Sequence, residues 1–408
     1  MRLLRQGVAA RRQQDPGPGG PYAVRHDHRR AARPGRRGRR LRQRRHRLHG
    51  RGGRRRYRSR RREGRGGRRV KAARFHEFGG ADKLVVEDVP VPSPEPDQVV
   101  VRIAASALNH LDVDIREGVS RFPFELPHTP GIELVGEITE KGSAVGDEWR
   151  VGDRVMPYLL ATCGSCRYCR TGRESLCLTP VFAGGGYAEY TAVLARQLVR
   201  LPEGLDDVDA AATQIAFATA WHMMFTRGKL QAGETVMINS VGSGVGSAAV
   251  QLAEYAGAFV IGNASTEEKL DRAKGLGMHE GIDYTKEDVP ERVRELTGGM
   301  GADMVIEYVG GDSFQFGLDS LAKDGRMVTC GAHAREVVDF DVIPFFRQQH
   351  TVIGSFVFNR DEVEKVLDLA GRGLIRPAVH KTFPLDEARE AMETMESRAH
   401  FGKLVLVP

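Results

Sequence analysis

The stretch "TVMINSVGSGVGSAAVQLAEYAG", residues 235–257, decides the fold. It opens as a short apolar strand, passes through a glycine-rich turn and continues as an apolar helix. The turn contains Gly242, Ser243, Gly244, Val245 and Gly246. Such a backbone would let a pyrophosphate approach the N-terminus of the helix. The spacing is G-x-G-x-G rather than a strict G-x-G-x-x-G, so the turn alone could also serve only to pack helix against strand.

Alternating strands and helices surround this turn. Strands are expected at 235–241, 259–264, 281–284, 303–309, 326–331 and 351–357, and helices at 246–257, 267–277, 289–298 and 313–323. Apolar strands that alternate with helices predict a parallel sheet covered on both faces, which is an α/β, doubly wound Rossmann fold. Within six such strands, the glycine turn is expected to bind a dinucleotide.

The preceding region, from residue 70 to about 205, has short Val-rich runs bounded by Gly, Pro and Asp. Examples are "DQVVVRIAASAL" (97–108), "IELVGEIT" (132–139) and "GDRVMPY" (152–158). This pattern predicts an irregular β domain with few helices. A long apolar helix is expected at 209–225. The tail, 363–408, is expected to form two helices and a last strand that returns to the first domain.

The end of the second strand of the alternating region selects the cofactor. NAD sites place Asp or Glu there to hold the ribose 2′-hydroxyl. This chain instead reads "GNASTEEK" (262–269), with Ser265, Thr266 and Lys269 at the tip. Hydroxyls and a lysine suit a 2′-phosphate, so NADP(H) is expected over NAD(H), which stays possible. Ser265 could instead only cap the following helix, with Glu268 completing a capping box.

Four of the five cysteines lie in "CGSCRYCRTGRESLC", residues 163–177. The spacing C-x2-C-x2-C-x7-C predicts one Zn²⁺ bound by Cys163, Cys166, Cys169 and Cys177. A disulfide pair and an iron–sulfur cluster are the alternatives, but the cluster run would continue with x3 and Cys-Pro, which is absent. Four thiolates leave no open coordination position, so this zinc is expected to be structural.

Residues 1–69 have a composition unlike the rest of the chain. They carry 27 Arg, no Lys and three acids, a net charge of +24; since the whole chain carries +8, the remaining 339 residues carry −16. Such a segment cannot build a core. It could be a nucleic-acid-binding tail, a transit peptide, or upstream sequence translated ahead of a true start at Val70. The third interpretation is preferred, because the basic residues are all arginine and "VKAARFHEFGG" reads as an enzyme's opening strand.

Membrane and secretory classes do not fit this sequence. There is no run of 18 apolar residues and no apolar segment of a signal peptide after Met1. Five cysteines with four in one cluster do not form a secreted disulfide framework. A cytoplasmic setting is therefore expected.

The cysteine lobe, the β domain before it, the glycine turn after it and the returning C-terminus together resemble the medium-chain dehydrogenase/reductase superfamily, which includes zinc alcohol dehydrogenases and quinone oxidoreductases. The resemblance covers residues 70–408. It implies a GroES-like catalytic domain (70–215), a Rossmann domain (216–358), a C-terminal return (359–408) and a homo-oligomer, dimer or tetramer. It also implies cofactor contacts at Thr219, Gly310 and Gly331.

The resemblance fails at the catalytic zinc of the alcohol dehydrogenases. "ALNHLDVDIREG" (107–118), "PGIELVG" (130–136) and "TQIAFATAW" (213–221) match the three segments that carry its ligands. Asn109, Ile132 and Ile215 stand at the three ligand positions, and Ile cannot bind a metal. A site rebuilt from His110, His128 and His222 is a minor alternative.

Without a Lewis acid, an alcohol keeps a high pKa and its hydride is hard to remove. Reduction of an activated double bond by NADPH demands less, since the enolate needs only hydrogen-bond donors and a proton. Asn109 is the candidate donor, His110 the candidate acid, and Asp112 a further candidate that could simply fix the backbone. The alternatives are a zinc-dependent alcohol dehydrogenase with atypical ligands, and an NADPH-binding protein that acts on nucleic acid through its Arg-rich extension. The small-molecule substrate is not identified.

Overall fold

The computed structural model describes residues 67–122, 124–182 and 184–408. The extension predicted at 1–69 lies outside these ranges except for its last three residues. Strand β1 (Arg69–Arg74) pairs antiparallel with β2 (Val85–Pro90), and Arg69 already lies opposite Pro90. The opening strand therefore begins one residue before Val70.

The N-terminal part is built on a seven-stranded sheet in the order β16-β17-β3-β4-β5-β9, with β8 also paired to β3. Alternation along β3 directs Val99, Val101 and Ile103 into one buried cluster, as the Val-rich pattern predicted. The strands are β3 (Gln98–Ala107), β4 (Glu133–Lys141), β5 (Arg154–Pro157), β8 (Tyr190–Leu194), β9 (Leu198–Arg200), β16 (Val379–Pro384) and β17 (Lys403–Val407), with β6 (Leu160–Ala161) and β7 (Val181–Phe182) forming a separate pair.

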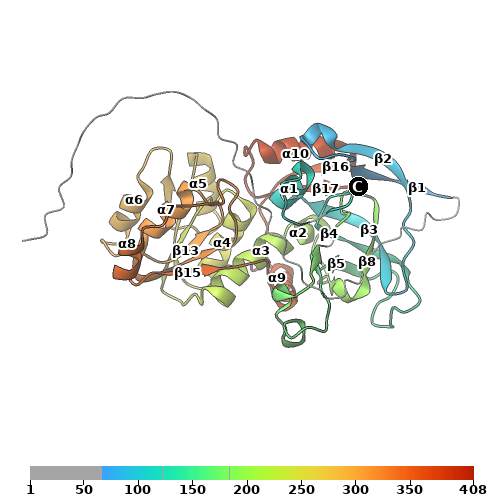
Figure 1. Ribbon diagram of the computed structural model, residues 1–408, viewed down its shortest axis with the longest axis horizontal. Helices are drawn as coiled ribbons and strands as arrows, with labels where there is room; N and C mark the ends of the chain where they lie inside the picture. The colour runs from blue at the N-terminus through green and yellow to red at the C-terminus, as the bar shows by residue number, and fades with distance from the viewer. Residues whose placement is uncertain (1–66, 123, 183) are drawn as a thin grey trace, which may run out of the picture. The chain divides into compact units, whose positions relative to one another are not determined.

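The C-terminal strand returns to this sheet. β17 pairs antiparallel with β3, so that Val405 lies opposite Ala107 and Leu406 opposite Ser106. β17 lies between β16 and β3 in this sheet, and Figure 1 labels the three strands close to the C-terminus of the chain. Gly402, just before β17, donates its N–H to the carbonyl of Gly242 at 2.8 Å. The predicted return is confirmed, and it brings the chain end against the glycine turn.

The second sheet has six parallel strands in the order β12-β11-β10-β13-β14-β15, which confirms the predicted Rossmann architecture. Its strands are β10 (Thr235–Ile238), β11 (Phe259–Ala264), β12 (Glu280–Asp283), β13 (Ala302–Glu307), β14 (Leu321–Thr329) and β15 (Thr351–Gly354). Its helices include α4 (Gly244–Tyr255), α5 (Glu267–Lys274), α6 (Val289–Leu296) and α7 (Asp312–Asp319). The chain order reverses at β10, which puts the glycine turn where such sheets bind ligands.

The single helix predicted at 209–225 is wrong. The segment forms α2 (Asp207–Ala211), α3 (Gln214–Trp221) and a π-helix (His222–Arg227). At the first break, the Thr213 hydroxyl donates to the Asp209 carbonyl at 2.7 Å, while the Gln214 side chain bonds to the backbone of residues 157 and 159. Side-chain bonds to the backbone compete with the helical pattern, and an apolar composition does not reveal them.

The remaining helices are α1 (His110–Glu117), α8 (Val342–Arg347), α9 (Arg360–Gly371) and α10 (Ala388–Glu396). The two helices expected in the tail correspond to α9 and α10. Helix α8 was not expected; its sequence, VIPFFR, is apolar but short, and Val342, Ile343 and Phe346 are exposed rather than buried. No helix within the described ranges is long and apolar enough to cross a bilayer.

Candidate active site and metal lobe

The glycine turn lies between β10 and α4. Ser243 is the N-cap residue of α4, and its hydroxyl accepts a hydrogen bond from the N–H of Gly246 at 3.0 Å. A Cβ on Gly246 would lie 2.4 Å from the Ser240 carbonyl oxygen, and one on Gly244 would lie 2.8 Å from Cδ of Lys403. Both positions therefore require glycine, which leaves the bare backbone that a pyrophosphate needs.

Tyr308, just after β13, supports this turn from the neighbouring strand. Its hydroxyl hydrogen-bonds the Asn239 carbonyl and lies 3.0 Å from the Ser243 hydroxyl. The Tyr308 ring is buried, and burial raises the pKa of its phenol far above the ordinary value, so it stays a neutral donor. Sequence reasoning missed Tyr308, because a lone tyrosine after a strand belongs to no motif.

The tip of β11 carries the residues expected to choose the cofactor. Thr266, not Ser265, caps α5, and its hydroxyl accepts from the Lys269 N–H at 3.4 Å. The alternative that Ser265 caps this helix is thus off by one residue. The Lys269 ammonium donates to the Arg398 carbonyl at 2.7 Å, and its stem lies beside Gly242. A cation therefore stands between the glycine turn and the end of β11.

Burial lowers the pKa of Lys269, with Glu268 opposing that shift. An arginine and a histidine lie near this lysine. Arg272 lies over the Phe401 ring, 4.4 Å from its centroid. His380 is close enough that Arg272 and Lys269 help burial to lower its pKa. Lys269 and Arg272 thus bring two cations to the end of β11, opposed by the carboxylates of Glu267 and Glu268 in the first turn of α5.

A buried ion pair occupies the region of the three replaced ligand positions. The Lys403 ammonium donates to the Leu108 carbonyl at 2.7 Å, to Oδ1 of Asn109 at 2.7 Å and to Oε2 of Glu133 at 2.9 Å. The other carboxylate oxygen of Glu133 accepts from the N–H of Ile215 at 2.6 Å. Positions 109 and 215 are thus bridged by one carboxylate, and the positive charge beside it is an ammonium of the chain itself.

Asn109 has no free amide hydrogen in this network. Its amide nitrogen donates to the Ala107 carbonyl at 3.2 Å and to Oε2 of Glu133 at 3.0 Å. Since Lys403 donates to the amide oxygen, the orientation of the amide is fixed by its partners. The geometry favours a positioning role for Asn109 over the predicted role as donor to a substrate oxygen.

Asp112 is fully buried and serves the backbone. Its carboxylate accepts from the N–H groups of Gly131 at 2.9 Å, Ile132 at 3.3 Å and Asn109 at 3.0 Å, and Tyr187 lies 3.5 Å away. Desolvation raises the pKa of Asp112 to about 6, although these hydrogen bonds oppose the shift. The structure supports the backbone-fixing alternative, because every partner named is a group that Asp112 holds in place.

His110 is the first residue of α1, and its ring lies 4.9 Å, centroid to centroid, from the ring of His333. It is accessible to solvent, yet surrounding protein desolvates it and, with His333, lowers the pKa of His110 to about 4. His110 is therefore neutral at pH 7 and cannot act by itself as an imidazolium acid. Sequence reasoning did not select His333.

The other two histidines considered for a rebuilt metal site have separate surroundings. The His128 ring lies against Phe75 and Phe124, and the buried His222 hydrogen-bonds Glu362 at 2.8 Å. Among the described residues, one group of at least three His, Cys, Asp or Glu side chains can hold a metal ion, and it is the cysteine lobe. The geometry therefore gives no support to a metal site rebuilt from histidines.

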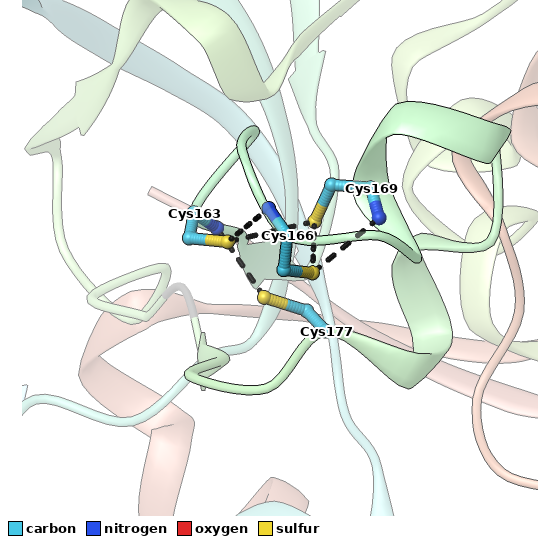
Figure 2. Close-up of side chains that lie close together, drawn as sticks. All are labelled: Cys163, Cys166, Cys169 and Cys177. Atoms are coloured by element: carbon cyan, nitrogen blue, oxygen red, sulfur yellow. Dashed lines mark hydrogen bonds between the residues drawn. The ribbon is translucent and has the colours of Figure 1, made fainter. Parts of the chain in front are cut away.

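The four lobe cysteines converge as their spacing predicted, and Figure 2 shows their sulfur atoms turned toward one another. All four sulfurs lie within 4.8 Å of each other. Backbone N–H groups of Cys166 and Cys169 point at the sulfurs of Cys163 and Cys166, at 3.3 and 3.5 Å. Such bonds favour thiolates: the N–H groups of Ser165 and Cys166 lower the pKa of Cys163 to about 6. The donor set fits a closed tetrahedral Zn²⁺ site.

The three cofactor contacts implied by the family stay predictions. Thr219 is buried in α3, which packs against α4. Gly310 has φ +75°. Gly331 follows β14, and a Cβ added to Gly331 would lie 2.4 Å from the Tyr308 carbonyl oxygen. Thr219 and Gly310 lie on or after elements next to the glycine turn, and Gly331 follows the strand beyond β13.

Two family models match the chain. One, described as an alcohol dehydrogenase GroES-like domain, matches residues 95–203, and one, described as a zinc-binding dehydrogenase, matches residues 244–372. A 2-haloacrylate reductase from a Burkholderia species is 34% identical over 353 residues, which cover 83% of this chain and 98% of that protein. A quinone oxidoreductase from Rattus norvegicus is 29% identical over 347 residues, 83% of this chain and 97% of that protein. A crystal structure of an NAD-dependent alcohol dehydrogenase matches with a TM-score of 0.79 and 35% identity, over 83% of this chain and 99% of that one.

Proposed function

Because the chain belongs to the medium-chain dehydrogenase/reductase superfamily, we propose that it is an NADPH-dependent oxidoreductase that transfers hydride to an activated double bond. The substrate class is a quinone, an enone or an enoyl thioester. The proposed enzyme also binds one structural zinc through the cysteine lobe. Two relatives of the chain, described above, are named for reduction of a double bond or a quinone: 2-haloacrylate reductase and quinone oxidoreductase.

The observation that carries the proposal is the Lys403–Glu133 pair with its bonds to Asn109 and Ile215. The residues at the three ligand positions offer an amide and two hydrocarbon side chains, and the amide is already engaged. These residues cannot hold the Lewis acid that oxidation of a simple alcohol requires. Addition of hydride to a polarised double bond needs positive potential near the developing enolate instead.

The N-terminus of α1, at His110, carries a partial positive charge that can supply this potential. The charge of the nearly buried Lys403 is balanced by the carboxylate of Glu133. A bound reduced nicotinamide would supply the hydride. The glycine turn and Ser243 would hold its pyrophosphate at the N-terminus of α4.

A substrate screen tests the proposed reaction. Purified protein should oxidise NADPH with 2-haloacrylates, enones, enoyl thioesters or quinones, and it should not oxidise simple alcohols at a comparable rate. Brief treatment with a mild chelator should leave the rate unchanged, because the lobe site is closed by four thiolates. Absorbance of NADPH and metal content are measured on the same sample. Rapid inactivation by the chelator, reversed by zinc, with a simple alcohol as the best substrate, would establish the metal-dependent alcohol dehydrogenase instead.

The cofactor preference rests on Lys269 beside the end of β11. Lys269→Ala should weaken NADPH binding roughly 10-fold, the effect of one lost hydrogen bond to a charged group, and leave NADH binding unchanged. Titration of cofactor fluorescence measures both affinities. Lys274→Ala is the matched control, since Lys274 lies on the same helix in its last turn and pairs with Asp271. Equal losses for NADPH and NADH in Lys269→Ala, or tighter NADH binding by the unmodified protein, would refute the assignment.

A further inference from the structure

A buried carboxylate that has no part in the site described above lies at the end of β13. Glu307 is the last residue of that strand and is fully buried. In the described part of the chain its side chain has three hydrogen-bond partners, and none of them is a cation. Burial of a carboxylate costs free energy unless its oxygens are hydrogen-bonded. The three partners therefore indicate what Glu307 does in the fold.

One oxygen of Glu307 holds the chain just after the strand. Its Oε1 accepts hydrogen bonds from the N–H of Val309 at 2.8 Å and from the N–H of Gly310 at 2.9 Å. Successive N–H groups converge on one oxygen only where the backbone turns away from the line of the strand. Gly310 has φ +75°, in the left-handed region that favours glycine. The carboxylate thus fixes the direction in which the chain leaves β13.

The other oxygen of Glu307 joins this turn to the neighbouring strand. Its Oε2 accepts from the hydroxyl of Thr329 at 3.3 Å, and Thr329 lies opposite Glu307 in the parallel pairing of β13 with β14. The N–H of Cys330 also donates to the backbone carbonyl of Glu307 at 3.2 Å. Burial, with a smaller contribution from Glu307, raises the pKa of the Cys330 thiol to about 12, so this neighbour is neutral at pH 7. One residue therefore ties together the ends of both strands.

The turn that Glu307 holds borders the glycine turn. Tyr308, the next residue, donates its hydroxyl to the Ser240 carbonyl at 3.0 Å, and that hydroxyl lies 3.0 Å from the hydroxyl of Ser243. β13 lies beside β10, on the side opposite β11. A dinucleotide lies across the point where the strand order of such a sheet reverses. A cofactor with its adenosine half at β11 therefore has its nicotinamide half on the side of β13.

We propose that Glu307 is a positioning residue for the nicotinamide half of the cofactor. The proposal rests on the proposed NADPH-dependent function. Glu307 does not contact the cofactor itself, because its side chain is fully buried and both of its oxygens are engaged. It acts through the backbone of Val309 and Gly310. Without the carboxylate these two N–H groups lose their acceptor, and the turn is no longer held in one conformation.

The adenosine half of the cofactor depends on other contacts. The glycine turn is held by the bond from the Gly246 N–H to the Ser243 hydroxyl and by the bonds of the Tyr308 hydroxyl. None of these bonds uses the carboxylate of Glu307. Loss of that carboxylate should therefore weaken binding of one half of the cofactor and spare the other, which a purely structural role would not do.

The experiment compares Glu307→Ala, Glu307→Gln, Thr329→Val and Asp312→Ala with the unmodified protein. Titration calorimetry measures the affinities for NADPH and for adenosine 2′,5′-bisphosphate, which lacks the nicotinamide half. We expect Glu307→Ala to bind NADPH roughly 10- to 100-fold more weakly, the effect of losing hydrogen bonds to a charged group, and to bind the bisphosphate as before. Glu307→Gln should keep most of the NADPH affinity, because its amide oxygen accepts from the same two N–H groups.

Two variants complete the comparison. Thr329→Val removes the bond to the other oxygen and should weaken NADPH binding less than Glu307→Ala, again without an effect on the bisphosphate. It carries the test if Glu307→Ala does not fold. Asp312→Ala is the matched control, because Asp312 lies on the same segment but is 85% exposed and pairs only with Arg335, at 3.5 Å. This variant should retain both affinities.

Three results would overturn the positioning role. The first is unchanged NADPH affinity in Glu307→Ala. The second is an equal loss for NADPH and the bisphosphate, in Glu307→Ala or, if that variant does not fold, in Thr329→Val. The third is a Glu307→Gln protein that binds NADPH as weakly as Glu307→Ala, since the hydrogen bonds to the turn are then not what matters. Failure of the proposed function looks different: the unmodified protein then binds neither NADPH nor the bisphosphate, or reduces no conjugated acceptor in the screen.

Discussion

Replacing Lys403 with methionine should lower the free energy of unfolding by about 3–5 kcal/mol. Glu133 is fully buried, and Lys403 is the one cation that contacts its carboxylate in the described part of the chain. Methionine keeps much of the stem that packs beside Gly244 but removes the ammonium. The Glu133 charge would then remain buried without a counter-ion. The Leu108 carbonyl and the Asn109 amide oxygen would also each lose a donor.

Denaturant unfolding of four proteins tests this result. Adding Glu133→Gln to the Lys403→Met protein should recover much of the lost free energy of unfolding, because it removes the buried charge that has no counter-ion. Lys365→Met is the control: Lys365 pairs with Asp361 on the surface of α9, and such exposed pairs contribute about 0.3–0.5 kcal/mol. If the free energy of unfolding of Lys403→Met lies within about 1 kcal/mol of that of the unmodified protein, Glu133 does not carry its charge in the folded state.

The parts of the site that could be predicted from the sequence are those where only a few residue types can do the job. The glycine turn needs small residues because Gly244 and Gly246 face Lys403 and a backbone carbonyl at less than 3 Å. The cysteine lobe brings its four sulfur atoms together from one short loop, so the spacing of the cysteines alone marks it. The central strands β10, β11 and β13 of the second sheet are almost wholly buried, so they appear as nearly continuous apolar runs.

Other features depend on contacts between distant parts of the chain. Glu133 and Lys403 are 270 residues apart, and only the pairing of β17 with β3 brings them together. A signal was nevertheless present, because both faces of "KLVLV" are apolar after the lysine. A strand buried on both faces requires a partner for its lysine. His333 lacked even this signal, since its segment contains no regular element between β14 and α8.

Cys166→Ser should reduce the zinc content from about one ion per chain to nearly none and destabilise the protein by more than about 4 kcal/mol. Three remaining thiolates do not close a tetrahedral site, and the lobe has no core of its own to replace the metal. The lobe is also tied to the rest of the protein. The Ser175 N–H donates to the Asn359 side chain at 3.2 Å, and Asn359 caps α9 in a box with Glu362.

Loss of the lobe should therefore loosen the first turn of α9 before it affects the glycine turn. Glu362 accepts from the N–H of Asn359 at 2.6 Å and also hydrogen-bonds His222, so a misplaced Asn359 disturbs two buried partners. Hydrogen exchange in Cys166→Ser should accelerate at the start of α9 and stay slow in α4. Cys330→Ala is the control, because Cys330 lies outside the lobe and its removal should leave the zinc content unchanged. Three results would contradict a single site held by four thiolates: two zinc ions per chain in the unmodified protein, iron in the lobe, or full zinc occupancy in Cys166→Ser. If Cys166→Ser instead loses one zinc together with the order of α9, the lobe is the anchor of that helix.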